Sequence, residues 1–129
     1  MSLSPALREF LSERHLATLV TLRADGTPHS VPVGFTYRDE GSTGVVRVIT
    51  SGSSVKVANA RHSGRASVTQ IDGPRWVTFE GAARVLDDTV DVADAVEAYA
   101  RRYRQPRERD DRVVIEIEVQ RMMCNSRLK

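Results

Sequence analysis

Cysteine and aromatic residues are scarce in this sequence of 129 residues: Cys124 is the single cysteine, and aromatic residues make up 5%. A single cysteine excludes an internal disulfide bond and any CxxC metal or redox motif. No apolar run approaches the roughly 20 residues of a membrane span, and the opening residues, MSLSPALREF, lack the apolar core of a signal peptide. We therefore expect a protein of the reducing cytoplasm without a membrane partner.

Lysine is scarce as well. Of the 19 basic residues only Lys56 and Lys129 are lysine, and the rest are arginine. A genome that favours arginine codons explains this ratio, but it leaves Lys56 unusual within its own chain. The basic residues are dispersed among 17 acidic ones, and the formal net charge is only +2. A nucleic-acid surface needs a basic stripe interleaved with aromatic residues, so we expect no nucleic-acid partner.

Residues suited to metal or nucleophilic chemistry are not grouped in the sequence. His15, His29 and His62 fall in different predicted elements without metal-ligand spacing, so no metal site is predicted. No serine lies in a GxSxG elbow, and Cys124 lies in the tail MMCNSRLK with nothing to mark it as a nucleophile. The sequence therefore identifies no catalytic side chain.

Hydrophobic periodicity predicts six strands and three helices in a single domain, residues 1–129. We expect the strands at 15–23, 28–37, 45–51, 65–71, 75–86 and 113–119, and the helices at 5–13, 54–62 and 89–103. Most strands follow one another through hairpins, which is not the strand–helix alternation of a parallel sheet. The prediction is a mainly β fold, an antiparallel β-barrel with peripheral helices.

Glycine and proline mark the irregular points of these strands. Asp25-Gly26 and Asp72-Gly73 predict hairpin turns, and Gly81 predicts a bulge or bend within 75–86. Pro28 and Pro32 cannot donate to a strand ladder. The segment 28–37 is therefore expected at a sheet edge or with a bulge.

The stretch TSGSSVKVANA, residues 50–60, joins a predicted strand to a predicted helix that begins near Ser54. Unpaired backbone N–H groups at a helix N-terminus attract anions. Lys56 lies in the first turn, where the helix dipole disfavours a cation by a few tenths to about 1 kcal/mol, and a neighbouring anion would offset this. The phosphate-loop pattern GxxxxGK[ST] is absent. These residues alone favour a serine-capped helix with a solvated lysine, and an anion site is the alternative.

Three segments together resemble the flavin/deazaflavin oxidoreductase family in order and spacing: TLRADGTPHSVPVGF, VVRVITSGSSVKVANARHSGRASVTQIDG and RWVTFEGAARV. The resemblance covers residues 5–120 and implies a six-stranded split β-barrel of the pyridoxamine 5'-phosphate oxidase type. It also implies a homodimer with two cofactor clefts at the subunit interface. The phrases IDGPRW and RYRQPR, with RVVIEIEV after them, are most similar to the branch of deazaflavin-dependent biliverdin reductases.

This branch implies coenzyme F420, a 5-deazaflavin that carries a phosphate and an oligoglutamate tail. The implied reaction is hydride transfer from reduced F420 to a conjugated small molecule, with biliverdin giving bilirubin. Two alternatives stay open: an FMN-binding enzyme of the pyridoxamine phosphate oxidase type, and a non-catalytic module that binds F420 or a tetrapyrrole. The acceptor pocket is expected at loops 38–44 and 104–111, with Arg75, Arg104 and Arg107 available to substrate carboxylates.

The resemblance also implies which residues bind the cofactor. Its phosphate is assigned to Lys56, with hydroxyl donors and an amide supplied by Thr50, Ser51, Ser54 and Asn59. Its ring is assigned to the backbone groups of Val31, Pro32 and Val33, with Ile49 as an apolar support behind it. Gln70 and Trp76 are assigned to the part of the ring pocket that the neighbouring subunit completes. Taken alone, Trp76 is better explained by core packing.

One position departs from the family pattern. Many relatives have arginine immediately before the lysine, and this chain has Val55. A phosphate contact is therefore missing or supplied elsewhere, and Arg47, Arg61 or an arginine of the partner subunit are the candidates. Because FMN is held largely by its phosphate, this departure favours F420 over FMN.

Overall fold

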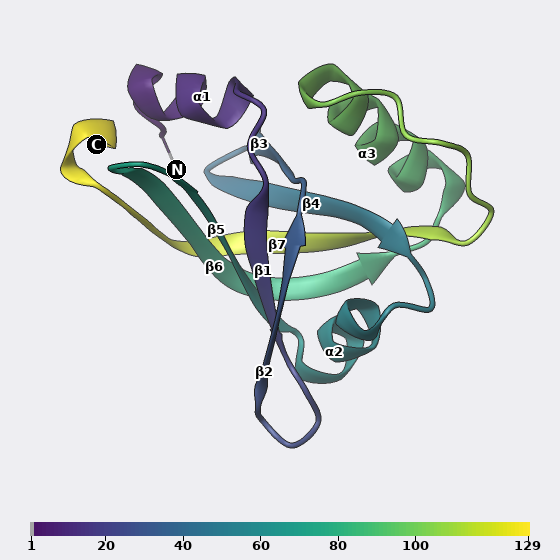
Figure 1. The fold of residues 1–129 in the computed structure, drawn as a ribbon. Helices are drawn as coiled ribbons and strands as arrows, with labels where there is room; N and C mark the ends of the chain where they lie inside the picture. Colours follow the sequence, from purple (N-terminus) through teal and green to yellow (C-terminus); the bar gives the residue numbers. More distant parts are fainter. Residues whose placement is uncertain (1) are drawn as a thin grey trace.

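Seven antiparallel strands form a single sheet in the computed structural model, which describes residues 2–129 (Figure 1). The strands are β1 (Ala17–Leu22), β2 (Pro28–Val33), β3 (Thr36–Glu40), β4 (Thr43–Ser51), β5 (Arg65–Asp72), β6 (Arg75–Leu86) and β7 (Arg112–Cys124). The helices are α1 (Pro5–Ser12), α2 (Val55–Ser63), α3 (Thr89–Arg102) and the short 3-10 helix η1 (Ser126–Leu128). The mainly β antiparallel fold with peripheral helices is confirmed.

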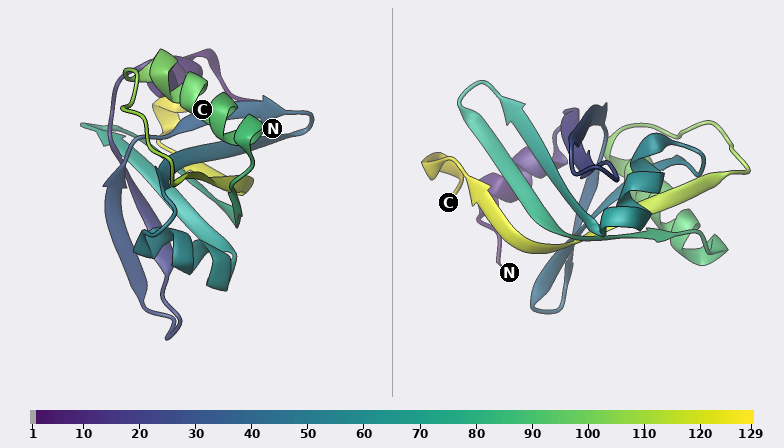
Figure 2. Two further views of the ribbon diagram at one scale, coloured as in Figure 1. Left: turned by 90° about the vertical axis from the view of Figure 1, so that its right-hand side faces the viewer. Right: turned by 90° about the horizontal axis from the view of Figure 1, so that it is seen from below.

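The predicted count of six strands is wrong, because the segment 28–37 is divided between both edges of the sheet. The strand order is β2-β1-β5-β6-β7-β4-β3, so β2 and β3 are the outermost strands, although only Gly34 and Phe35 separate them in the chain. Three Cα–Cα steps span at most about 11 Å. The sheet must therefore curl until its edges nearly meet, and it forms a split barrel that is not closed (Figure 2).

The break between β2 and β3 has a specific cause at Phe35. Its backbone N–H donates to the Tyr103 hydroxyl at 3.2 Å, and its carbonyl accepts from the Arg102 guanidinium at 2.6 Å. Both backbone groups are thus satisfied by the end of α3 instead of a neighbouring strand. The Phe35 ring is fully buried and meets Phe79 edge-on, which anchors the crossing in the core.

The predicted turns and bulge are confirmed. Gly26 and Gly73 adopt positive φ angles of 87° and 59° in the two hairpin turns. The pairing of β6 with β7 shifts between Glu80 and Gly81. A Cβ at Gly81 would lie 1.8 Å from the Glu118 carbonyl oxygen, so only glycine fits where the two backbones come this close.

Helix α3 covers the outer face of β4 and β7 (Figure 1) and buries a group of charged side chains there. Glu116 of β7 is only 3% exposed. It accepts hydrogen bonds from Arg47 of β4 at 2.8 Å and from Arg84 of β6 at 2.7 Å, and both arginines are its direct partners across the ladder. Burial alone would raise the pKa of Glu116, but the bonds from Arg84 and Arg47 outweigh it and lower the pKa below its ordinary value.

We expect Glu116→Gln to lower the free energy of unfolding by roughly 3 kcal/mol or more, because it leaves the buried Arg47 guanidinium without a counter-charge. Since the folded-state pKa is lowered, the wild-type stabilisation is present above the ordinary value of 4.5 and is lost as the pH falls through the lowered pKa. Urea unfolding at several pH values measures both effects. The matched control Glu97→Gln breaks the exposed pair with Arg101 and should cost below about 0.5 kcal/mol. Equal losses in the two variants would contradict this prediction.

Candidate functional site

A cleft of about 360 Å³ lies where the end of β4, the start of α2 and the connection from α3 to β7 meet. These three elements are at the right of Figure 1. The end of β2 forms the remaining wall of the cleft. The lining residues come from four distant parts of the chain: Pro32, Val33, Gly34, Ile49, Thr50, Ser51, Ser54, Lys56, Tyr99, Pro106, Arg109 and Arg112. The two segments that the sequence analysis assigned to phosphate and ring, 50–56 and 32–33, thus share one cavity.

One end of the cleft is rich in hydrogen-bond donors. Ser54 occupies the N-cap position of α2, but its side chain makes no capping bond and lies 3.5 Å from the Thr50 hydroxyl. The backbone N–H groups of Val55 and Lys56 meet no acceptor within residues 2–129. The serine cap expected from the residues alone is therefore not formed, and the first turn of α2 leaves donors available to an anion.

Lys56 adds an uncompensated positive charge to this end. Its side chain is partly buried, and desolvation lowers the pKa of its ammonium group from the ordinary value of 10.5. Among the described residues, no carboxylate forms an ion pair with it. A cation that is partly removed from water and unpaired favours the arrival of an anionic ligand.

Ser51 is tied to the opposite wall of the cleft. Its hydroxyl donates to the Asp111 carboxylate at 2.8 Å, and the Gly52 N–H donates to the Asp111 carbonyl at 2.7 Å. The Ser51 bond is the main cause of the lowered pKa of Asp111, and the Arg109 guanidinium, 3.4 Å from this carboxylate, acts in the same direction. These contacts fix the loop 51–53 against the start of β7.

The cleft also has apolar lining residues. Pro32, Val33 and Ile49 form its walls with Tyr99 of α3. A Cβ at Gly34 would lie 3.0 Å from the Tyr99 ring and 3.1 Å from the Tyr103 ring, so this glycine allows both tyrosines to approach the backbone. Such a surface suits one face of a planar ring system.

The remaining predicted residues do not line the cleft within one chain. Val31 packs against the core, and the buried Asn59 amide donates to the Thr21 hydroxyl at 3.1 Å. Gln70 is fully buried, where it donates to the Phe10 carbonyl and accepts from Arg102, so its side chain is a link within its own chain. Trp76 is partly buried at the start of β6 and pairs with Ile71 in the ladder.

The structure adds residues that the sequence analysis did not assign. Tyr99 falls within the predicted helix 89–103, and Arg112 belongs to no motif in the sequence. Arg112 enters the cleft because the β4–β7 register sets it opposite Ser51, a pairing that no local motif reveals. Arg109 lies in the loop 104–111 that was expected at the acceptor pocket.

A second polar cluster lies at the far end of β5 and β6. Atoms of Glu13, His15 and Asp72 lie within 4.8 Å of one another, a grouping hidden by their separation in the sequence. Arg75 donates to both carboxylates, at 2.9 Å to Glu13 and 2.6 Å to Asp72. The Arg75 bond, with a smaller contribution from His15, lowers the pKa of Glu13 to about 2. The cluster is therefore an ion-pair network, in which Arg75 is already engaged.

No helix within residues 2–129 is long and apolar enough to cross a membrane.

Comparison with known proteins identifies three similar proteins, one by sequence and two by structure. A protein of Mycobacterium tuberculosis named F420H(2)-dependent biliverdin reductase is 51% identical over 119 residues, which is 92% of this chain and 85% of that protein. A conserved hypothetical protein of the same organism has a similar structure, with a TM-score of 0.77, 24% identity and coverage of 96% of this chain and 84% of that one. A structure named F420 reductase gives a TM-score of 0.70 at 21% identity, over 90% of this chain and 94% of that one.

The two structural likenesses support the split-barrel fold and nothing finer. The sequence relationship is stronger, and it extends through both walls of the cleft. Residues 3–123 also match the family model described as pyridoxamine 5'-phosphate oxidase. By this match, which takes in all seven strands apart from the last residue of β7, the chain belongs to the pyridoxamine 5'-phosphate oxidase family.

Proposed function

We propose that this protein is an F420H2-dependent biliverdin reductase that binds coenzyme F420 in the cleft between β2, β4 and α2. The observation that carries the proposal is the pairing, in one cavity, of an unpaired Lys56 with an apolar wall about Pro32–Gly34. The 51% identical relative bears the name of this activity.

The residues present fit the phosphate and the ring of such a cofactor. Lys56 and the free N–H groups of Val55 and Lys56 would bind the phosphate oxygens, with the hydroxyls of Thr50 and Ser54 as further donors. Pro32 and Ile49 would support the ring. FMN also carries a phosphate and a flat ring, so it remains the alternative ligand of the same donors.

Reduced F420 supplies a hydride from C5 of its deazaflavin ring when bound, and a proton must reach the acceptor as well. The protein binds and orients both molecules. Within residues 2–129 the titratable side chains that line the cleft are Lys56, Tyr99, Arg109 and Arg112, and none is a carboxylate. We propose that the acceptor lies on the side of loop 104–111, where a second hollow of about 580 Å³ is bordered by Arg104 and Arg107. Their guanidinium groups suit its carboxylates.

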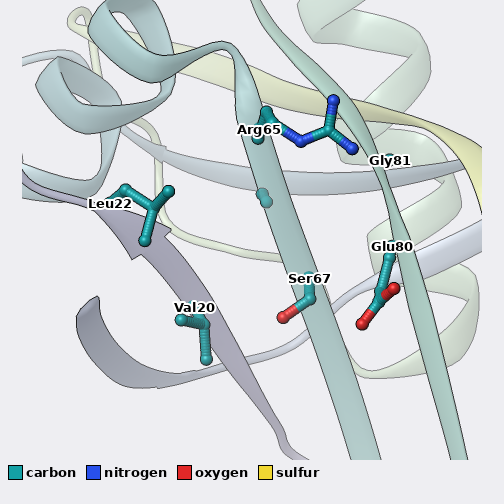
Figure 3. Close-up of a pocket in the computed structure, with 7 residues that line it drawn as sticks. Val20, Leu22, Arg65, Ser67, Glu80 and Gly81 are labelled. Atoms are coloured by element: carbon teal, nitrogen blue, oxygen red, sulfur yellow. The ribbon is translucent and has the colours of Figure 1, made fainter. Parts of the chain in front are cut away.

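We further propose that the protein is a cytoplasmic homodimer whose partner covers the outer face of β1, β5 and β6. Val20 and Leu22 of β1 lie there beside Ser67 and Glu80 around a hollow of about 260 Å³ (Figure 3). At the end of this face, Leu16 and Ile71 are 66% and 65% exposed. Exposed apolar side chains grouped on one face are typical of an interaction surface. Trp76, next to Ile71 in the ladder, would then lie near the partner.

The reaction is tested by mixing the protein with reduced F420 and biliverdin and following the return of oxidised deazaflavin absorbance together with the formation of bilirubin. We expect both signals to appear in equal amounts, since one hydride reduces one biliverdin. Reduced FMN in place of F420 is the matched control. Turnover with FMN alone would favour the flavin alternative, and binding of both ligands without turnover would favour a non-catalytic carrier.

Lys56→Ala should weaken F420 binding by about 10- to 100-fold, because it removes a charge-assisted bond to the phosphate. The measurement is a fluorescence titration, with thermal unfolding to show that the fold is kept. Lys129→Ala removes the other lysine of the chain, an exposed residue after η1, and should leave binding unchanged. An unchanged affinity in Lys56→Ala would contradict the phosphate assignment.

The dimer is tested by sedimentation equilibrium, which should give about twice the chain mass of 14.3 kDa. Ile71→Asp should shift the mass towards that of one chain, because it buries a charge in the interface. Val90→Asp changes an equally exposed apolar residue on α3, outside the proposed face, and should have no effect. A wild-type mass of one chain would contradict the proposed homodimer.

A further inference from the structure

Val55, immediately before Lys56 in the sequence, carries no charge that could bind a phosphate. Val55 is 55% exposed and is not part of the cleft lining. Lys56 alone supplies one positive charge, whereas a phosphate monoester or diester presents several oxygens to be bound. If F420 binds here, as proposed above, a second cation should be present at the same end of the cavity.

Arg47 and Arg61, the arginines of this chain that were candidates for the phosphate contact, cannot supply this second cation. Arg47 is held by Glu116 in the buried ion pair beneath α3, with its side chain only 9% exposed. Arg61 is exposed on α2 and does not line the cleft. Withdrawing Arg47 from Glu116 would leave a buried carboxylate unpaired, at a cost of several kcal/mol.

Two arginines do line the cleft, and their surroundings differ. Arg109 lies 3.4 Å from the Asp111 carboxylate, which already offsets its charge. Arg112 forms no ion pair with any acid of the described residues. It is partly buried, and it begins β7 directly opposite Ser51, the first residue of the segment 51–56 that carries the donors and is called the donor loop below.

We propose that Arg112 supplies the phosphate contact that Val55 cannot make, and so acts with Lys56 as the second cation of the anion site. The two cations approach from different elements: Lys56 from the first turn of α2, and Arg112 from the first residue of β7. The planar guanidinium can bind two phosphate oxygens at once, which the lysine ammonium cannot do in the same geometry.

Arg112 also borders the second hollow with Arg104 and Arg107. The experiment must therefore distinguish binding of the cofactor phosphate by Arg112 from binding of ligand carboxylates. Three ligands do this. The deazaflavin riboside has neither phosphate nor tail, its 5'-phosphate has a phosphate and no carboxylate, and complete F420 has both. Fluorescence titration gives the affinity of each for wild type, Arg112→Ala, Arg112→Lys and the matched control Arg61→Ala.

We expect Arg112→Ala to weaken the two phosphate-bearing ligands about 10- to 100-fold and to leave the riboside within about twofold. Arg112→Lys should restore part of the loss, and Arg61→Ala should change nothing. Thermal unfolding of each variant shows whether the fold is retained, and an unchanged riboside affinity confirms an intact cleft independently.

Three results would overturn the inference: an unchanged affinity for the phosphate-bearing form, an equal loss with the riboside, or a loss confined to the glutamate-bearing ligand. The last result would assign Arg112 to carboxylates. In each of these cases wild type still binds F420, and the proposed function survives. If wild type binds none of the three ligands, both the inference and the proposed function are wrong.

Discussion

The guanidinium of Arg102 is the contact on which the rest of the structure depends. It is 8% exposed at the end of α3, and it donates to the Glu13 carbonyl at 2.9 Å, to the Phe35 carbonyl at 2.6 Å and to the Gln70 side chain. The Gln70 side chain in turn donates a hydrogen bond to the Phe10 carbonyl of α1 at 3.0 Å. One fork of fixed geometry thereby joins α3 to the end of α1, to the β2–β3 crossing and to the sheet.

This junction also determines the shape of the cleft. By holding Phe35, Arg102 sets the position of the adjoining segment 32–34, which forms the apolar wall. By ending α3 at the same point, it sets where the connection to β7 begins, and that connection brings Arg109 and Arg112 to the donor loop. Neither Arg102 nor Gln70 lines the cleft. Their hydrogen bonds nevertheless fix the chain segments from which both walls of the cleft are built.

Local signals in the sequence were enough for most of the fold. Turn glycines, prolines and alternating apolar residues predicted the hairpins and the bulge at Gly81, because each of these depends on neighbours in the chain or on one adjacent strand. The division of 28–37 was missed, since the backbone of Phe35 is satisfied by Arg102 and Tyr103, 67 and 68 residues away. Glu116 lies within the predicted strand 113–119, but nothing in the local sequence shows that it is buried, because its environment depends on the packing of α3.

The candidate site likewise contains residues that the local sequence predicts and residues that it does not. The segment 50–56 could be recognised because its donors and Lys56 are consecutive, and a family resemblance added the ring wall. Arg112 could not be found, because its place depends on the β4–β7 register. The resemblance assigned Gln70 to the ring near the neighbouring subunit, and nothing in the local sequence shows that its side chain is buried within its own chain. Residues placed by strand pairing carry no local sign of their role.

The crossing at Gly34 and Phe35 has a consequence for how this chain tolerates changes in length. Since only these two residues connect opposite edges of the sheet, one added or deleted residue would move both edge strands and the cleft wall together. The turn at 23–27, by contrast, projects beyond the sheet (Figure 1) and can lengthen without disturbing either. Length variation within the family is therefore expected to concentrate in that hairpin and to be absent from the crossing.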